Sequence, residues 1–244
     1  MTSRIGASSL AKMDPEILVQ LEAGAIETAT LTEGLAINMA RLMSVVLPDA
    51  PVSEFNMDAG VVQRMAQGGA LLLQARNPLA FRTHASDTVR GWAAFGIGQD
   101  VNIEPLERID AILPFAADKH FGVREWAWMA IRAIIVADPI AAIERLTPWA
   151  DDADPNVRRF ASEATRPRGV WAASIPILRR APVHGLAILE RLRFDDTRYV
   201  EDSVANWLND AAKDNADWVA TILVEWESAG VSKRLVKRAS RSLI

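Results

Sequence analysis

A helix-start pattern that recurs at a fixed spacing constrains the fold of this chain more than any other feature. Val89–Ala93, Val123–Ala127 and Val157–Ala161 share the pattern Val-Arg-x-aromatic-Ala, and their Val residues lie 34 residues apart. A looser copy begins at Val200, 43 residues further on. A period of this size, with helical patterning and no strand signals, is typical of stacked helical hairpins. The sequence therefore predicts an all-α fold, an α-α superhelix or solenoid.

The third copy shows how one helix can carry two different faces. Asp154 can cap the helix and Pro155 suits its first turn. An apolar stripe at helical spacing is formed by Val157, Phe160, Ala161 and Ala164. A separate charged row, at steps of four and three, is formed by Arg159, Glu163 and Arg166. Pro167 and Gly169 are expected to end this helix.

Composition narrows the class of protein further. At 244 residues, half of them hydrophobic, the chain is long enough for one large domain or a short solenoid. The absence of Cys excludes disulfides and thiolate chemistry. No apolar run reaches the roughly 18–20 residues of a membrane span, and the N-terminus lacks signal-peptide order. We expect a soluble cytoplasmic protein with a tail at 1–12 and a single repeat domain at 13–244.

The charge is unevenly distributed along the chain. The net charge is −4, but residues 231–244 contain no acid, which leaves 22 basic against 31 acidic residues elsewhere. The basic residues of this last segment are Lys233, Arg234, Lys237, Arg238 and Arg241. A basic C-terminal helix of this kind can meet phosphates, or it can be a solvated helix end favoured by the helix dipole.

Proline, glycine and capping residues predict where the other helices lie. We expect helices at 14–23, 31–46, 105–116, 122–136, 138–149, 154–166, 182–192, 196–213, 216–227 and 232–242. Asp58 is expected to cap a further helix through Leu72, and Asn77-Pro78 to start a short one. Residues 167–173 are expected to form a loop.

Two positions of each repeat are expected to lie one turn apart on the same helix face. The second position from each Val is occupied by Gly91, Glu125, Arg159 and Asp202, and the sixth by Phe95, Met129, Glu163 and Asn206. Charge gathers at these positions only in the last three units. This asymmetry indicates a functional site rather than a uniform scaffold.

A segment near the N-terminus, Glu27–Ile37, has the sequence Glu-Thr-Ala-Thr-Leu-Thr-Glu-Gly-Leu-Ala-Ile. This segment resembles the AlkC group of the AlkC/AlkD-like DNA alkylation-repair glycosylases. Arg124–Ala127 and Val157–Glu163, continuing through Thr165–Arg168 to Trp171, resemble the group as well. The strongest resemblance lies in Tyr199–Val200, Ser203–Asn206 and Leu208–Asp214, and the resemblance covers roughly residues 13–228. Glu201 and Asp202 stand where relatives often carry a basic pair.

The resemblance implies a fold of HEAT-like repeats and a monofunctional glycosylase. Such an enzyme hydrolyses the bond between deoxyribose and a cationic N-alkylated base of the 3-methyladenine or 7-methylguanine kind. Its partner would be duplex DNA carrying such bases, and it is expected to act as a monomer without a cofactor. The acids that the resemblance places near the lesion are Glu125, Glu163 and Asp210. It also implies that Arg159 binds the DNA backbone and that Trp171 lies near the substrate.

The chemistry independently suits these residue types. An alkylated ring nitrogen makes the base a cationic leaving group, and the sugar passes through an oxocarbenium-like state. A carboxylate can stabilise that state and orient water, while an aromatic face can hold a cationic base. The substrate-binding candidates are Trp128, Trp171, Asn206 and Trp207. The DNA-binding candidates are Arg159, Arg166, Arg168, Lys213, Lys233, Arg234 and Lys237. No metal site is expected, because His84, His120 and His184 lie far apart without ligand spacing.

Each candidate also has a purely structural interpretation. Glu163 could belong to an intrahelical ion-pair ladder, and Glu125 could pair with Arg132 or Arg158. Asp210 could be a surface acid near Lys213, and Trp207 could simply pack in the core. Two other functions remain open for the whole chain: a DNA-binding protein of the same fold that does not cleave, and a protein-interaction scaffold.

Overall fold

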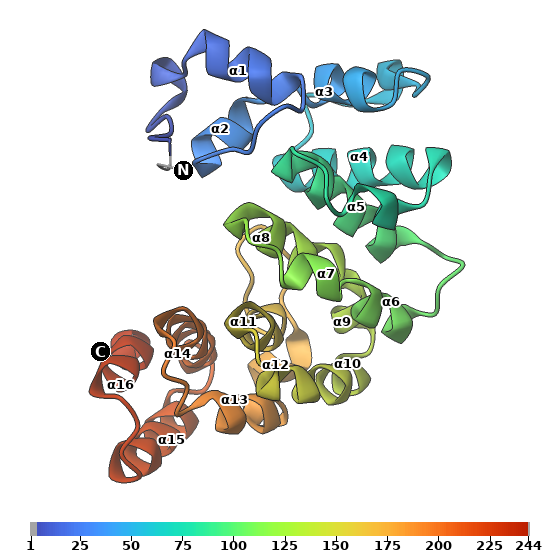
Figure 1. The fold of residues 1–244 in the computed structure, drawn as a ribbon. Coiled ribbons are helices and arrows are strands. Elements are labelled where there is room, and N and C mark those ends of the chain that lie inside the picture. The colour runs from blue at the N-terminus through green and yellow to red at the C-terminus, as the bar shows by residue number, and fades with distance from the viewer. Residues whose placement is uncertain (1–3, 244) are drawn as a thin grey trace. The chain divides into compact units, whose positions relative to one another are not determined.

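A computed structural model describes residues 4–243 of the chain. These residues form helices joined by short loops, and no strand occurs among them (Figure 1). Extended pairing within the described residues is limited to one isolated antiparallel bridge, between Gly169 and Ala172. The all-α prediction is therefore confirmed. Between Arg4 and Leu243, no helix combines the length and the apolar character that crossing a membrane requires.

The chain divides into two compact units, which we describe separately. The first unit contains the residues up to Ile103 together with Asp118–Ala130, and the second contains Glu104–Ala117 and the residues from Ile131 onward. The segment 104–117 thus leaves the first unit before the chain returns to it at Asp118.

The first unit is built on helices that pack closely. They are α1 (Pro15–Glu22), α2 (Leu31–Ala36), α3 (Met39–Val46), α4 (Val61–Ala75), α5 (Asp87–Gln99) and α8 (Phe121–Ala130). Helix α5 contacts both α4 and α8 (Figure 1). Gly68 and Gly69 on α4 allow this approach, because a Cβ at Gly68 would lie 2.3 Å from the indole nitrogen of Trp92. A Cβ at Gly69 would lie 2.6 Å from the Cβ of Phe95.

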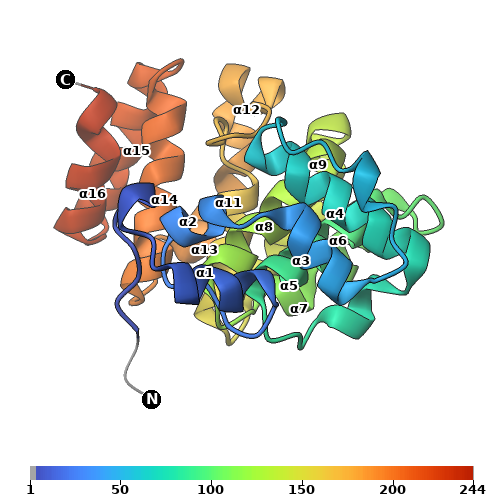
Figure 2. The ribbon, with the colours of Figure 1, turned by 90° about the horizontal axis from the view of Figure 1, so that it is seen from above.

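The second unit has α14 at its centre. Its helices are α6 (Pro105–Ala111), α7 (Leu113–Ala116), α9 (Arg132–Ala137), α10 (Pro139–Leu146), α11 (Pro155–Ala164), α12 (Pro176–Arg180), α13 (Leu186–Leu192), α14 (Arg198–Ala212), α15 (Ala216–Ser228) and α16 (Lys233–Ala239). Helix α14 contacts α11, α15 and α16, and Figure 2 shows the last three helices of the chain side by side. This packing buries Trp207 and Trp226 completely.

The arginine that follows Val in the first three repeat copies has a common structural role. Arg90, Arg124 and Arg158 each donate through Nη1 to the carbonyl six residues earlier, at 2.7, 2.6 and 3.0 Å respectively. The guanidinium therefore closes the loop that precedes each repeat helix. This shared contact explains why Arg recurs at that position of the sequence.

Two of these arginines also bind an aspartate from the following repeat. Arg90 donates through Nε to Asp118 at 2.8 Å, and Arg158 donates through Nε to Asp195 at 2.6 Å. Each aspartate also accepts the backbone N–H two residues further on, at 2.7 Å for Asp118 and 2.9 Å for Asp195. One carboxylate thus orders its own loop and joins that loop to the preceding repeat.

Several helix boundaries differ from those predicted. The helix expected at 31–46 is interrupted at Ile37, and Asn38 starts α3 by accepting the N–H of Arg41. The helix expected at 122–136 is interrupted at Ile131, where φ is −97° and ψ is 2°. The one expected at 105–116 is interrupted at Ile112. Asp58 does not cap α4, which follows Gly60 without a side-chain cap. The sequence does not predict helix α12, because this helix is only five residues long, from Pro176 to Arg180.

Candidate active site and nucleic-acid contacts

Glu163 and Asp210 lie together in the second unit, on either side of Arg166. The Nη1 of Arg166 donates to Glu163 Oε1 at 2.6 Å. Its Nε and Nη2 donate to Asp210 Oδ2 at 2.9 and 2.7 Å. The residues are 4% and 3% exposed, so both carboxylates are buried beside one guanidinium.

Further donors hold each carboxylate in place. Ser203 donates its hydroxyl to Glu163 Oε2 at 2.7 Å, and Arg159 Nη2 lies 3.4 Å from the same oxygen. Lys213 donates to Asp210 Oδ1 at 2.9 Å. The row of Arg159 and Glu163 on α11 and Arg166 just after its end follows from helical spacing. Packing of α14 against α11 adds Ser203 and Asp210 to it.

The cations keep the buried Glu163 ionised. Burial by itself raises the pKa of Glu163, but the charges of Arg159 and Arg166 and the Ser203 hydroxyl lower it below its usual value. Burial likewise lowers the pKa of Arg166, yet Glu163 and Asp210 hold it above its usual range. The intrahelical ion-pair ladder weighed for Glu163 is thus present, and it extends to α14. Arg166, a DNA-binding candidate, is thus engaged with two carboxylates inside the protein, and its contact with DNA stays a prediction.

Glu125 lies in the first unit, on α8, and is half-buried. Its Oε2 accepts the indole N–H of Trp128 at 2.8 Å, one helical turn away. Trp128 is buried, so its indole holds the carboxylate instead of offering a face to a base as expected. Glu125 belongs to a different unit from Glu163 and Asp210. That the three acids lie together near one lesion therefore stays a prediction.

Trp207 and Asn206, both on α14, have partners inside the protein. Trp207 is completely buried and donates its indole N–H to the carbonyl of Thr165 at 2.9 Å. Its expected contact with a base is therefore wrong, and the packing interpretation holds. The Oδ1 of Asn206 accepts from Arg241 Nη2 at 3.1 Å, which ties the end of the chain to α14.

Trp171 is the candidate aromatic residue that faces solvent. It is 51% exposed and has a φ of 59°, the one positive φ among the non-glycine residues described. It lies in the turn closed by the Gly169–Ala172 bridge. Such a conformation is rare for a bulky side chain and is found mostly where surrounding structure enforces it.

The arginines near this turn also have carboxylate partners. Arg168 Nη2 donates to both oxygens of Asp214, at 2.8 and 2.9 Å. Arg179 on α12 donates to the same carboxylate through Nε at 2.9 Å and Nη2 at 3.1 Å. The two guanidinium groups thus enclose the carboxylate of Asp214. The hydrogen bond from Arg179, more than any other contact, lowers the pKa of Asp214 to about 2. Sequence reasoning missed Arg179 because it lies on the unexpected α12.

The basic C-terminal segment divides into paired and exposed residues. Arg234 forms ion pairs with Glu201 and Asp202, and Arg238 Nε lies 3.2 Å from Asp202. The two acids on α14 therefore bind α16 within the chain, and Arg234 is engaged there. Lys233 and Lys237 are exposed and remain candidates for phosphate contacts.

Arg159 has a second contact besides Glu163. Its guanidinium carbon lies 4.3 Å from the centre of the Tyr199 ring, in cation–π geometry. The side chain is largely buried. Arg159 therefore links α11 to α14, whatever it contacts outside the protein.

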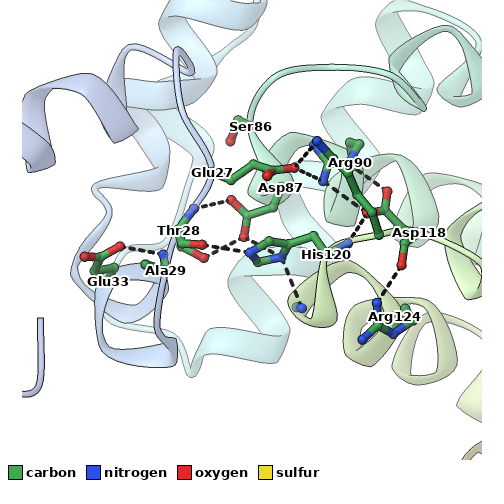
Figure 3. Close-up of polar contacts among 12 residues, drawn as sticks. Glu27, Thr28, Ala29, Glu33, Ser86, Asp87, Arg90, Asp118, His120 and Arg124 are labelled. Atoms are coloured by element: carbon green, nitrogen blue, oxygen red, sulfur yellow. Dashed lines mark hydrogen bonds and ion pairs between the residues drawn. The ribbon is translucent and has the colours of Figure 1, made fainter. Parts of the chain in front are cut away.

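The segment 27–37, which carries part of the resemblance, is anchored to α5. Thr28 donates its N–H to Asp87 Oδ1 at 2.9 Å and its hydroxyl to Oδ2 at 2.7 Å (Figure 3). His120 Nε2 lies 2.7 Å from the carbonyl of Thr28, and Glu27 accepts from Arg90 at 2.6 Å. This network orders the first unit through buried side chains.

Comparison with solved structures identifies the fold. The alkylpurine DNA glycosylase AlkC of Pseudomonas fluorescens, bound to DNA containing an abasic site analog, matches 84% of this chain with a TM-score of 0.62 and 24% identity. This chain has the AlkC-like fold. The match covers 60% of the AlkC chain, so about two fifths of AlkC is not matched by this chain. The predicted resemblance to the AlkC group is confirmed at the level of the fold.

Other comparisons agree in fold or in part of the sequence. The protein smu.31 of Streptococcus mutans matches 84% of this chain and 98% of its own, with a TM-score of 0.57 and 20% identity. The uncharacterized protein YhaZ of Bacillus subtilis is 39% identical over 85 residues, which are 34% of this chain and 24% of YhaZ. No protein-family model matches the sequence.

Proposed function

We propose that this protein is a DNA glycosylase that removes cationic N-alkylated bases from duplex DNA. The observation that carries the proposal is the fold that it shares with AlkC, a DNA alkylpurine glycosylase with an abasic-site DNA bound. The AlkC-like motifs around Glu125, Glu163 and Asp210 add support, because they place acidic residues on successive repeat helices.

We assign the reacting carboxylate to Glu125. Glu163 and Asp210 are buried against Arg166, whereas Glu125 is half-buried on α8 and accepts the indole N–H of Trp128. A carboxylate that is not fully buried can reach a bound substrate and offer its negative charge to a cationic transition state. Glu163 and Asp210 are proposed to fix Arg166 and the adjoining helices around the bound DNA.

The proposed reaction needs no acid to activate the leaving group. The bond between C1′ and the base nitrogen breaks, and the cationic base departs with the electron pair as a neutral molecule. Glu125 stabilises the oxocarbenium-like sugar, then takes a proton from the water that adds to C1′. The products are the free alkylated base and an abasic site.

The experiment measures release of 7-methylguanine and 3-methyladenine from methylated duplex DNA. Glu125→Gln is expected to lower the single-turnover rate by about 100-fold or more, since it removes a charge and a general base. DNA affinity should be retained. Glu144→Gln, at an exposed position of α10, is the matched control and should act like wild type. Absence of base release by wild type, or full activity of Glu125→Gln, would refute the assignment.

A second candidate function is DNA binding without base removal. It is favoured by the cations around Glu163 and Asp210, which neutralise two of the three expected catalytic acids. This alternative gives salt-sensitive binding of duplex DNA by wild type, with no base released at any enzyme concentration.

A further inference from the structure

Arg132 is buried at the start of α9, and three of its nitrogens donate to backbone carbonyls of one distant segment. Its Nη1 donates to Ala164 at 2.7 Å, Nη2 to Arg166 at 2.8 Å and Nε to Ala173 at 2.7 Å. The residue is 3% exposed. The guanidinium thereby caps the C-terminal end of α11 and joins both ends of the chain segment 164–173.

The position of this charge is costly for the fold. Burial and, to a smaller extent, the charge of the nearby Arg166 together lower the pKa of Arg132 to about 10, although Glu163 and Asp210 act in the opposite direction. A buried cation is retained where its hydrogen bonds compensate for lost hydration. These three bonds go to the segment that leads into and out of the turn 169–172, so the buried charge stabilises that segment.

The held segment has a rigid base and an exposed tip. At its base, Pro167 and Ile175 are buried, and the N–H of Ile175 donates to the carbonyl of Pro167 at 3.0 Å. At its tip, the Gly169–Ala172 bridge leaves Val170 and Trp171 facing solvent. The left-handed backbone at Trp171 is unfavourable for a residue other than glycine and persists only where the surroundings enforce it.

We propose that Arg132 is a positioning residue that holds the turn 169–172, so that the exposed indole of Trp171 is pre-organised to stack on a DNA base. An exposed aromatic side chain offers the kind of stacking surface on which a nucleic-acid base can lie. Fixing such a side chain before binding reduces the entropy lost on association. The stacking part rests on the proposed function, whereas the clamp can be tested without DNA.

The first test observes Trp171 directly in the free protein. With 5-fluorotryptophan incorporated at all eight tryptophans, the Trp171 signal is identified by its loss in Trp171→Phe. In Arg132→Lys and Arg132→Met, this 19F signal should move and broaden while those of the buried Trp92 and Trp226 stay in place. Arg145→Lys, at an exposed position of α10 in the same unit, is the matched control and should leave all signals unchanged.

The second test measures chymotrypsin cleavage after Trp171 under native conditions. Loss of the clamp should increase the rate of this cut at least about tenfold, because cleavage requires the turn to open. Lys keeps the charge but cannot reach three carbonyls at once, so Arg132→Lys should lie between wild type and Arg132→Met. If Arg132→Met does not fold, Arg132→Lys alone decides the comparison with Arg145→Lys.

The third test compares kinetics of base release. Arg132→Lys should raise KM for methylated DNA about tenfold with a smaller change in kcat, and adding Trp171→Ala to it should have little further effect. Unchanged 19F signals and cleavage rates in both Arg132 variants would overturn the clamp. Additive kinetic effects of the Arg132 and Trp171 substitutions would overturn the pre-organisation of stacking. A wild-type protein without base release would refute the proposed function, and the clamp would then be judged by the first two tests.

Discussion

Glu163 and Asp210 lie 47 positions apart in the sequence, yet the guanidinium of Arg166 binds both of their carboxylates, at 2.6 Å and 2.7 Å respectively. Two helices, α11 and α14, are thereby joined by a buried network of alternating charge. Arg159 and Arg166 bind Glu163, and Arg166 and Lys213 bind Asp210. The burial of Glu163 and Asp210 in this network is the reason we place the reacting charge on Glu125 and a supporting role on the other two acids.

Asp210→Asn should destabilise the second unit strongly. It leaves Arg166 buried with one carboxylate instead of two, and breaking one side of a buried ion pair costs about 3–5 kcal/mol. The free energy of unfolding is measured by urea denaturation. Asp214→Asn is the control, because that carboxylate lies in an exposed pair and its loss should matter much less. Equal effects of the two substitutions would argue against the buried network as a stabilising element.

Glu33 should make the N-terminal part of the first unit sensitive to acid. The buried carboxylate accepts from Arg4 Nη2 at 2.7 Å, from the N–H of Ala29 at 2.7 Å and from the N–H of Ala7 at 3.0 Å. Burial raises the pKa of Glu33, but these bonds outweigh it and lower the pKa from 4.5 to about 2.

The sign of the pH effect follows from that shift. Because the folded pKa lies below the unfolded one, ionised Glu33 contributes its stability above about pH 4.5 and loses it as the pH falls toward 2. The contribution is on the order of 3 kcal/mol at 1.36 kcal/mol per pKa unit. Denaturation from pH 7 to pH 2 should show wild type and Glu33→Gln converging in acid. A constant difference across this range would show that Glu33 does not titrate in this window.

Trp171→Gly should be more stable than Trp171→Ala, although both remove the indole. Glycine adopts a φ of 59° without strain, whereas alanine keeps the strain of the left-handed backbone, a difference of about 1 kcal/mol. Thermal unfolding gives the ranking. Both variants should bind methylated DNA more weakly than wild type. An alanine variant at least as stable as the glycine variant would show that the turn relaxes when the indole is removed.

Lys233 and Lys237 should contribute to DNA affinity through charge alone. Each exposed lysine that contacts a phosphate adds about 0.9 to the slope of log K against log salt. The double variant Lys233→Gln and Lys237→Gln should therefore reduce the slope by up to about 2 without changing thermal stability. Arg234→Gln is the comparison, because it removes ion pairs with Glu201 and Asp202 and should reduce stability instead. An unchanged salt slope in the lysine variant would exclude α16 from the DNA contact.

Local features of the fold could be predicted from the sequence because they depend on residues close together in the chain. Asp154 caps its helix as expected, since a cap needs only an acceptor next to the first turn. The charged row of Arg159, Glu163 and Arg166 follows from the helical period alone. Helix interruptions at Ile37 and Ile131 could not be predicted in this way, because no proline or glycine marks either position.

The candidate site was predictable in its residue types but not in its contacts. Trp128 and Trp207 are of a residue type that often binds ligands, yet helix packing buries both side chains. From the sequence, Arg132 is predicted only as a possible partner of Glu125. Nothing near it in the sequence indicates that it binds a loop about 40 residues later. Partners at such separations are selected by how helices rotate and pack against each other.

The sequence by itself determined that the chain is helical, that it repeats, and which face of α11 carries charge, since periodicity and capping act within a few residues. Only the tertiary structure decided that Asp210 joins Arg166, that Glu201 and Asp202 hold Arg234, and that Trp171 faces solvent while Trp207 does not. Those outcomes depend on which helix faces meet when the apolar stripes are buried. Helical periodicity fixes the faces of each helix but not the neighbour against which each face packs.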